Sequence, residues 1–194
     1  MYLKSFFTVI LILLFNVQSV FAYAEIRAEN NAYRHNNKGL IYLKENYYFG
    51  AIKEFQIAID LMPEAQGSAV YYVNLGMTYE KIGYPSLALP CYEKALKLHP
   101  LFFDYYVRVA EIYNKLGITD EKLEEYQNKK FNPLNNIMIG VLLIQKGEIS
   151  TGITLLDNFC NEEEKLIITK GVREYINKIV KQYPEASKPC KNAN

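Results

Sequence analysis

The stretch AVYYVNLGMTYEKIGYPSLALPCYEKALKLHP, residues 69–100, decides the fold of this chain. It has the pattern of two helices of similar length, separated by a turn at residues 83–85. Small side chains recur where two crossing helices leave no room for a branched residue, and large apolar side chains recur between them. The small residues are Gly76, Ala88 and Ala95, and the large ones are Tyr72, Leu75, Tyr79 and Tyr92. This pattern predicts a helix hairpin that buries the seam between its two helices.

The same pattern recurs on both sides of this stretch. Gly39, Gly76 and Ala110 occupy equivalent positions, and Gly140 takes that position in a fainter, strongly apolar copy. A hairpin of this kind cannot bury its apolar face alone, so copies are expected to stack on one another. The spacing predicts four hairpins, over residues 32–65, 69–102, 103–132 and 133–160.

A unit of about 34 residues with small and aromatic residues at these positions resembles the tetratricopeptide repeat (TPR). The resemblance implies an all-α fold, namely a right-handed α–α superhelix of about three to four hairpins closed by a C-terminal capping helix. It also implies that the first helix of each hairpin lines a concave groove that binds a peptide, helix or loop of another protein. Transferred position by position, the groove residues would be Tyr33, Asn36, Leu40, Leu43, Val70, Val73, Asn74, Met77, Glu80, Asp104, Val107, Arg108 and Glu111.

The groove residues do not fit one well-known use of this family, the clamp that grips the C-terminal carboxylate of a partner. Asn74 and Arg108 match the clamp, but Asn36 and Asp104 stand where lysines are needed and Leu40 where an asparagine is needed. Asp104 would repel a carboxylate. A mixed, largely apolar groove remains, suited to an extended or helical segment with apolar anchors. The alternative is that these side chains only pack against neighbouring helices.

The C-terminal part carries the pattern of one amphipathic helix over residues 161–183. Asn161 followed by Glu164 resembles a capping box. Apolar residues recur at helical spacing from Ile168 to Tyr183, and most lysines lie off that stripe. This predicts a capping helix that covers the open end of the solenoid. The polar tail 184–194 follows Pro184.

The N-terminal residues have the pattern of a targeting segment. Lys4 precedes an apolar run from Phe6 to Phe15, and Ala22-Tyr23-Ala24 offers a small-residue cleavage site. We therefore expect a signal peptide over residues 1–24, a polar lead-in over 25–31, and a periplasmic or secreted protein. The alternative is an uncleaved segment that tethers a structural scaffold to a membrane, although the run is shorter than the roughly 20 residues a span needs.

The chain has three cysteines, an odd number for an exported protein. Cys91 falls on a predicted helix face and is expected to be buried. Cys160 and Cys190 could form a disulfide across the last helix in an oxidising compartment.

No pattern in the sequence indicates catalysis or cofactor binding. His35 and His99 have no cysteine or carboxylate at metal-ligand spacing, and no glycine-rich phosphate loop occurs. The net charge of +1 without a basic block argues against nucleic-acid binding. We therefore predict a non-enzymatic interaction module without cofactor or metal. A thiol-dependent enzyme using Cys91 is the less favoured alternative, and self-association is left open.

Overall fold

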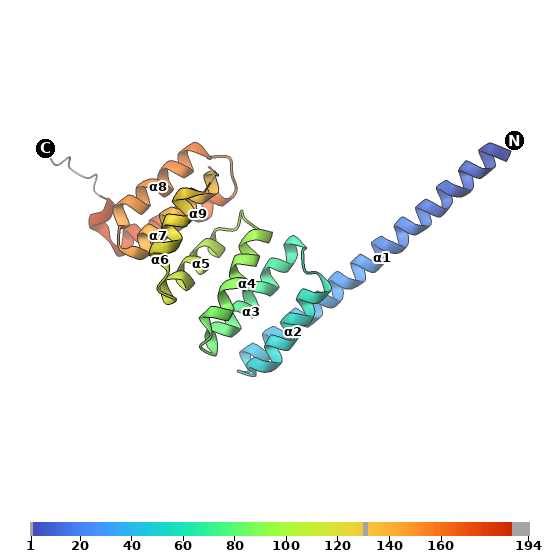
Figure 1. The fold of residues 1–194 in the computed structure, drawn as a ribbon, viewed down its shortest axis with the longest axis horizontal. Coiled ribbons are helices and arrows are strands. Elements are labelled where there is room, and N and C mark those ends of the chain that lie inside the picture. Colours follow the sequence, from blue (N-terminus) through green and yellow to red (C-terminus); the bar gives the residue numbers. More distant parts are fainter. Residues whose placement is uncertain (1, 130–131, 188–194) are drawn as a thin grey trace. The chain divides into compact units, whose positions relative to one another are not determined.

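The computed structural model describes residues 2–129 and 132–187, and for residues 2–19, 21, 186 and 187 it describes the backbone alone. The chain divides into two compact units, Met1–Tyr71 and Tyr72–Asn194. The described residues form nine α-helices and two short 3-10 helices without a strand (Figure 1). The predicted fold class, an all-α solenoid built from helix hairpins, is confirmed.

Unit 1 is a hairpin of α1 (Tyr2–Lys44) and α2 (Tyr48–Leu61), followed by the 3-10 helix η1 (Gln66–Ser68). The two helices approach closely at Gly39, where an added Cβ would lie 2.6 Å from the Phe55 ring. Phe55 is fully buried. The small residue at Gly39 therefore serves the helix crossing that the sequence predicted.

Helix α1 begins far before the predicted first hairpin. We expected a polar lead-in over residues 25–31 and a helix from Ala32, but α1 runs unbroken through both. The physical reason lies in the sequence, which contains no proline and no glycine before Gly39. Alanine, glutamate and arginine in residues 22–29 favour the helix further.

A buried carboxylate joins the two helices of unit 1. Glu54 of α2 lies 2.6 Å from Lys38 Nζ and 2.6 Å from His35 Nδ1, both on α1. Burial alone would raise the pKa of Glu54, but the hydrogen bonds with Lys38 and His35 lower it below its ordinary value. Lys38 precedes Gly39 as Leu75 precedes the equivalent Gly76, and its ion pair with Glu54 gives this charged residue a structural partner at that position.

Unit 2 continues with three further hairpins and a last helix. Left-handed glycines, which accept a positive φ without strain, close the hairpins at Gly83, Gly117 and Gly147. The helices are α3 (Ala69–Lys81, which begins at the end of unit 1), α4 (Pro85–Leu98), α5 (Phe103–Lys115), α6 (Thr119–Asn128), α7 (Pro133–Lys146), α8 (Ile149–Glu162) and α9 (Ile168–Gln182), followed by the 3-10 helix η2 (Pro184–Ser187).

Glycine again marks the close helix crossings of unit 2. A Cβ on Gly76 would lie 2.7 Å from the Tyr92 ring, and a Cβ on Gly140 would lie 2.6 Å from Leu156. Tyr92 and Leu156 are both buried. The seams of the hairpins α3–α4 and α7–α8 therefore depend on the absence of a side chain at these glycines.

The last helix begins later than predicted. We expected it to start at Asn161, but α8 continues to Glu162 and α9 starts at Ile168. The last turns of α8 place Phe159 and Cys160 in the core, and Arg173 of α9 donates a hydrogen bond to the Cys160 carbonyl at 3.1 Å. These interactions hold the chain helical past the expected cap. Helix α9 packs on α8 and also contacts α5.

Within the described parts of the chain, no helix combines the length and the apolar character needed to cross a membrane.

Candidate functional site

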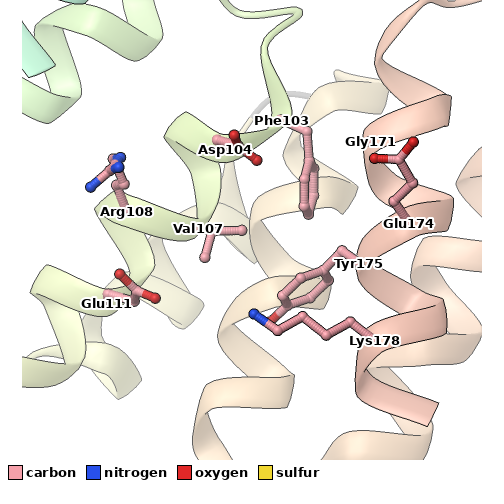
Figure 2. Close-up of a pocket in the computed structure, with 9 residues that line it drawn as sticks. All are labelled: Phe103, Asp104, Val107, Arg108, Glu111, Gly171, Glu174, Tyr175 and Lys178. Atoms are coloured by element: carbon pink, nitrogen blue, oxygen red, sulfur yellow. The ribbon is translucent and has the colours of Figure 1, made fainter. Parts of the chain in front are cut away.

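A hollow of about 350 Å³ lies between α5 and α9 of unit 2 (Figure 2). Helix α5 contributes the four residues that the family resemblance assigned to a groove in the third hairpin. The residues that line the hollow are Phe103, Asp104, Val107, Arg108 and Glu111 from α5, and Gly171, Glu174, Tyr175 and Lys178 from α9.

The apolar part of this hollow is made by two aromatic rings and a valine. The Phe103 and Tyr175 ring centroids lie 5.2 Å apart with a tilt of 53°. This close approach requires Gly171, where an added Cβ would lie 2.8 Å from Phe103 Cβ. Figure 2 shows Val107 and the Tyr175 ring facing the space between the two helices. Burial, together with the nearby Glu111 charge, raises the pKa of Tyr175 to about 12, so its hydroxyl stays protonated at neutral pH.

Charged side chains border the rings on both walls. Asp104 and Glu111 stand on α5 and Glu174 on α9, and all three are exposed. None of the three carboxylates has an ion-pair partner among the described residues, and neither has the Lys178 ammonium. These four groups are therefore available to a ligand.

Arg108 is engaged on the other side of α5. Its guanidinium carbon lies 5.9 Å from the centroid of the Tyr92 ring, and Figure 2 shows the side chain directed away from Tyr175. Tyr92 donates a hydrogen bond to Glu80, which also pairs with Lys115. Arg108 and Glu80 thus belong to a polar cluster that ties α3, α4 and α5 together.

A second hollow of about 370 Å³ adjoins the first and shares Phe103, Asp104, Gly171 and Glu174 with it. The loop before α5 and the loop before α9 add exposed apolar side chains here, namely Leu101, Phe102 and Ile167. We call the two hollows together the α5–α9 groove.

The other residues assigned to a groove are not gathered at this site. Tyr33, Leu40 and Val70 are exposed in unit 1, whereas Leu43 is half-buried there. Asn36, Val73 and Asn74 are buried, with 5–7% of their surface exposed, so they are not presented to a partner in the way the resemblance implied. Met77 on α3 is half-buried.

Sequence reasoning missed the contribution of α9. We assigned this helix to closing the end of the solenoid and did not place Tyr175, Glu174 or Lys178 in a groove. The one signal in the sequence was Gly171, a glycine one residue before the buried Val172 in an otherwise strong helix pattern. Such a glycine indicates close approach of another element.

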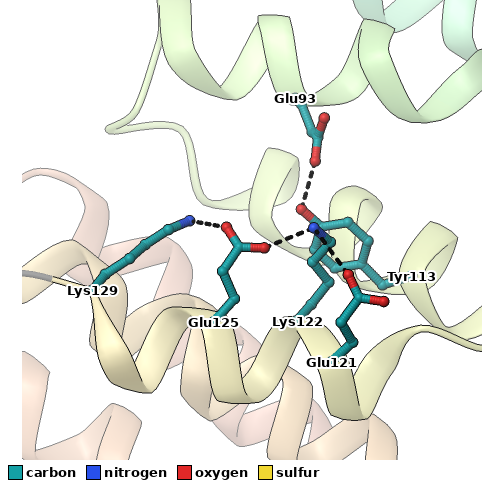
Figure 3. A network of polar contacts seen from close by, with 6 residues as sticks. All are labelled: Glu93, Tyr113, Glu121, Lys122, Glu125 and Lys129. Atoms are coloured by element: carbon teal, nitrogen blue, oxygen red, sulfur yellow. Dashed lines mark hydrogen bonds and ion pairs between the residues drawn. The ribbon is translucent and has the colours of Figure 1, made fainter.

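A further polar network on α4, α5 and α6 is structural (Figure 3). Tyr113 donates a hydrogen bond to Glu93 at 2.7 Å, and Glu125 lies 2.7 Å from both Lys122 Nζ and Lys129 Nζ. Hydrogen bonds from Lys122 and Lys129 lower the pKa of Glu125 to about 2. A carboxylate that is ionised throughout the neutral range does not act as a proton donor.

The two described cysteines are buried free thiols. Burial raises the pKa of Cys91 to about 11 and also raises the pKa of Cys160. Neither thiol forms an appreciable amount of the nucleophilic thiolate at neutral pH, which disfavours the thiol-enzyme alternative. Cys190 lies outside the described residues, so its disulfide with Cys160 stays a prediction.

No cluster of three or more histidine, cysteine, aspartate or glutamate side chains suited to a metal ion occurs in the region that the structure describes.

Comparison with known proteins agrees with the helix-hairpin pattern. Residues 69–102, which contain α3 and α4, match the sequence profile of the tetratricopeptide repeat family. These residues are similar to a TPR, and they contain the Gly76–Tyr92 contact described above.

A curated relative and several solved structures are also similar to the chain. The "Uncharacterized protein ycf37" of Guillardia theta is 35% identical over 79 residues, which are 40% of this chain and 44% of that protein. The chain thus matches less than half the length of this relative. A tetratricopeptide repeat protein from Parabacteroides merdae is 20% identical, with a TM-score of 0.49, over 81% of this chain and 63% of that one. The first TPR of Spaghetti (RPAP3), solved with an HSP90 peptide, is 17% identical, with a TM-score of 0.46, over 71% of this chain and 96% of that one.

Proposed function

We propose that this chain is a non-enzymatic protein-interaction module that binds a peptide or helical segment of a partner protein in the α5–α9 groove. TPRs generally mediate protein–protein interaction. The observation that supports the site most directly is the first hollow, where Val107 and Tyr175 face open space between carboxylates and an ammonium. These charged groups have no ion-pair partner in the described part of the chain.

The size and chemistry of the groove suit a segment of polypeptide. Each hollow is at the lower end of the range of about 300–1,000 Å³ for ligand pockets, which fits one or two side chains. The hollows adjoin, so a partner segment can place successive anchors in them, as a helix does in a hydrophobic groove. The exposed Leu101, Phe102 and Ile167 extend the apolar contact at one end.

A charge placed among the aromatic rings is expected to abolish binding. The test is selection of random peptides displayed on phage against the immobilised full chain, in parallel with Val107→Lys. We expect peptides enriched on the wild type and lost on the variant, because a lysine at this position would fill the hollow and its ammonium would be desolvated by any apolar anchor.

The matched control is Leu87→Lys, which makes the same kind of change at an exposed position of α4 outside the groove. This variant should retain the selected peptides. Equal recovery on the wild type and on Val107→Lys would show that the groove is not the binding site, and the proposal would fail.

We further propose that the protein is exported, on the strength of the apolar run and the small-residue cleavage site in the N-terminal sequence. The competing proposal is a scaffold tethered to a membrane through an uncleaved N-terminal segment. N-terminal sequencing of the protein purified from its native cell separates the two. We expect a start at Glu25, or at Tyr23 if cleavage follows Ala22 instead of Ala24. A start at residue 1 or 2 in the membrane fraction would reject export with cleavage and support the scaffold.

A further inference from the structure

We infer that the first hollow of the α5–α9 groove accepts a lysine or arginine side chain, so that the partner segment is basic rather than acidic. This inference rests on the proposed function, because it specifies the occupant of the same site.

The floor of the hollow suits a cation. Phe103 is buried beneath the site, whereas Tyr175 is half-buried and presents its ring to the open space. The face of an aromatic ring carries negative electrostatic potential and attracts an ammonium or guanidinium within about 6 Å of the centroid. A long basic side chain can also lay its methylene groups against Val107 and the rings.

The walls of the hollow provide the complementary charge. Asp104 and Glu111 stand about two turns apart on α5, and Glu174 stands on α9. All three carboxylates lack ion-pair partners among the residues described, so a bound cation would not have to displace an existing partner.

The two cations that line the hollow do not cancel this charge. Arg108 lies over the ring of Tyr92 on α4, the tyrosine that also donates a hydrogen bond to Glu80, and it is directed away from Tyr175. Lys178 is the single ammonium on the open side. Three carboxylates against one ammonium leave the first hollow with a negative potential. Lys170 lines the second hollow, and counting it against the same three carboxylates still leaves a negative balance that would repel an acidic segment.

The first test concerns the composition of the peptides selected on the full chain. We expect enrichment of lysine and arginine beside apolar residues. Enrichment of aspartate and glutamate, or of apolar residues without any charge preference, would overturn this inference and leave the proposed function standing. Recovery of no peptide above the Val107→Lys background would instead remove the proposed function.

The second test measures affinity by fluorescence anisotropy with the most enriched basic peptide, labelled with fluorescein. Glu111→Gln and Glu174→Gln should each raise Kd about two- to fivefold, which is the range for an exposed ion pair. Lys178→Gln should lower Kd by a similar factor, because it removes a repulsive charge. Higher ionic strength should weaken binding to the wild type.

The glutamate variants are expected to raise Kd and the Lys178 variant to lower it. Damage to the fold would raise Kd in every variant, so changes of opposite sign indicate recognition of charge. The control Lys181→Gln removes an exposed ammonium of α9 that lies outside the hollow and should leave Kd unchanged. Unchanged Kd in both Glu111→Gln and Glu174→Gln would overturn the inference. So would a dimer in sedimentation that Val107→Lys dissociates, since that result assigns the hollow to a second copy of the chain.

Discussion

Replacing Tyr92 with alanine is expected to lower the free energy of unfolding by about 3–5 kcal/mol, the range for deleting a large aromatic side chain from a core. The side chain is 1% exposed and fills the α3–α4 seam against Gly76. Its hydroxyl donates a hydrogen bond to Glu80, which also pairs with Lys115. The substitution would leave a cavity at the helix crossing and remove one member of the cluster that connects three helices.

Urea denaturation of the full chain, followed by circular dichroism, measures this loss. The chain has two compact units, which can unfold in separate steps. Hydrogen exchange of the α4 and α5 amides therefore shows which urea transition belongs to the unit that contains Tyr92. Tyr84→Ala is the control, since Tyr84 is an exposed tyrosine in the turn before α4. A Tyr92→Ala midpoint equal to that of the control would show that the seam does not depend on this ring.

The hairpin seams could be predicted from the sequence because each needs a small residue and a large residue at a fixed spacing, and this spacing recurs in three hairpins. Gly39 meets Phe55, Gly76 meets Tyr92 and Gly140 meets Leu156, and each pair is 16 residues apart. A close helix crossing needs a small residue on one helix and a large one on the next. This rule needs only the spacing between residues of one hairpin, so the all-α hairpin fold followed from the sequence alone.

The partner of α9 could not be predicted in the same way. The apolar stripe through Ile168, Val172 and Ile179 correctly indicated which face of the helix is buried. A stripe does not specify what covers it, and contacts between α5 and α9 join residues about 70 positions apart. Sequence reasoning therefore named the α5 residues that line the first hollow and missed those on α9, and the binding role of this hollow stays a prediction.

The extent of α1 shows a different limit. Residues 25–31 are polar, which we took as a sign of a lead-in outside the helix. Polarity separates buried from exposed surface, whereas helix formation depends on backbone propensity. Exposed Tyr23, Ile26 and Glu29 are compatible with a helix that has solvent on that side.

Adding a single methyl group at Gly152 is expected to destabilise the protein by about 1–3 kcal/mol, the usual cost of overpacking. Helix propensity alone would favour alanine over glycine by about 1 kcal/mol at this position inside α8. The added Cβ, however, would lie 2.6 Å from the Gly140 carbonyl oxygen and 2.6 Å from Ile144 Cγ1. A backbone oxygen cannot rotate away as a side chain can, so α7 and α8 would have to separate.

Gly67→Ala provides the matched control, because the same substitution there places a Cβ with nothing within 4 Å and without a positive φ. We expect urea midpoints unchanged or slightly higher for Gly67→Ala and clearly lower for Gly152→Ala. Equal midpoints would mean that α7 and α8 can move apart at little cost, which would contradict a seam fixed by contact between two glycine backbones. A lower urea midpoint in Gly152→Ala alone would show that stability depends on the close packing of α7 and α8. The number of glycines in the chain would then not explain the effect.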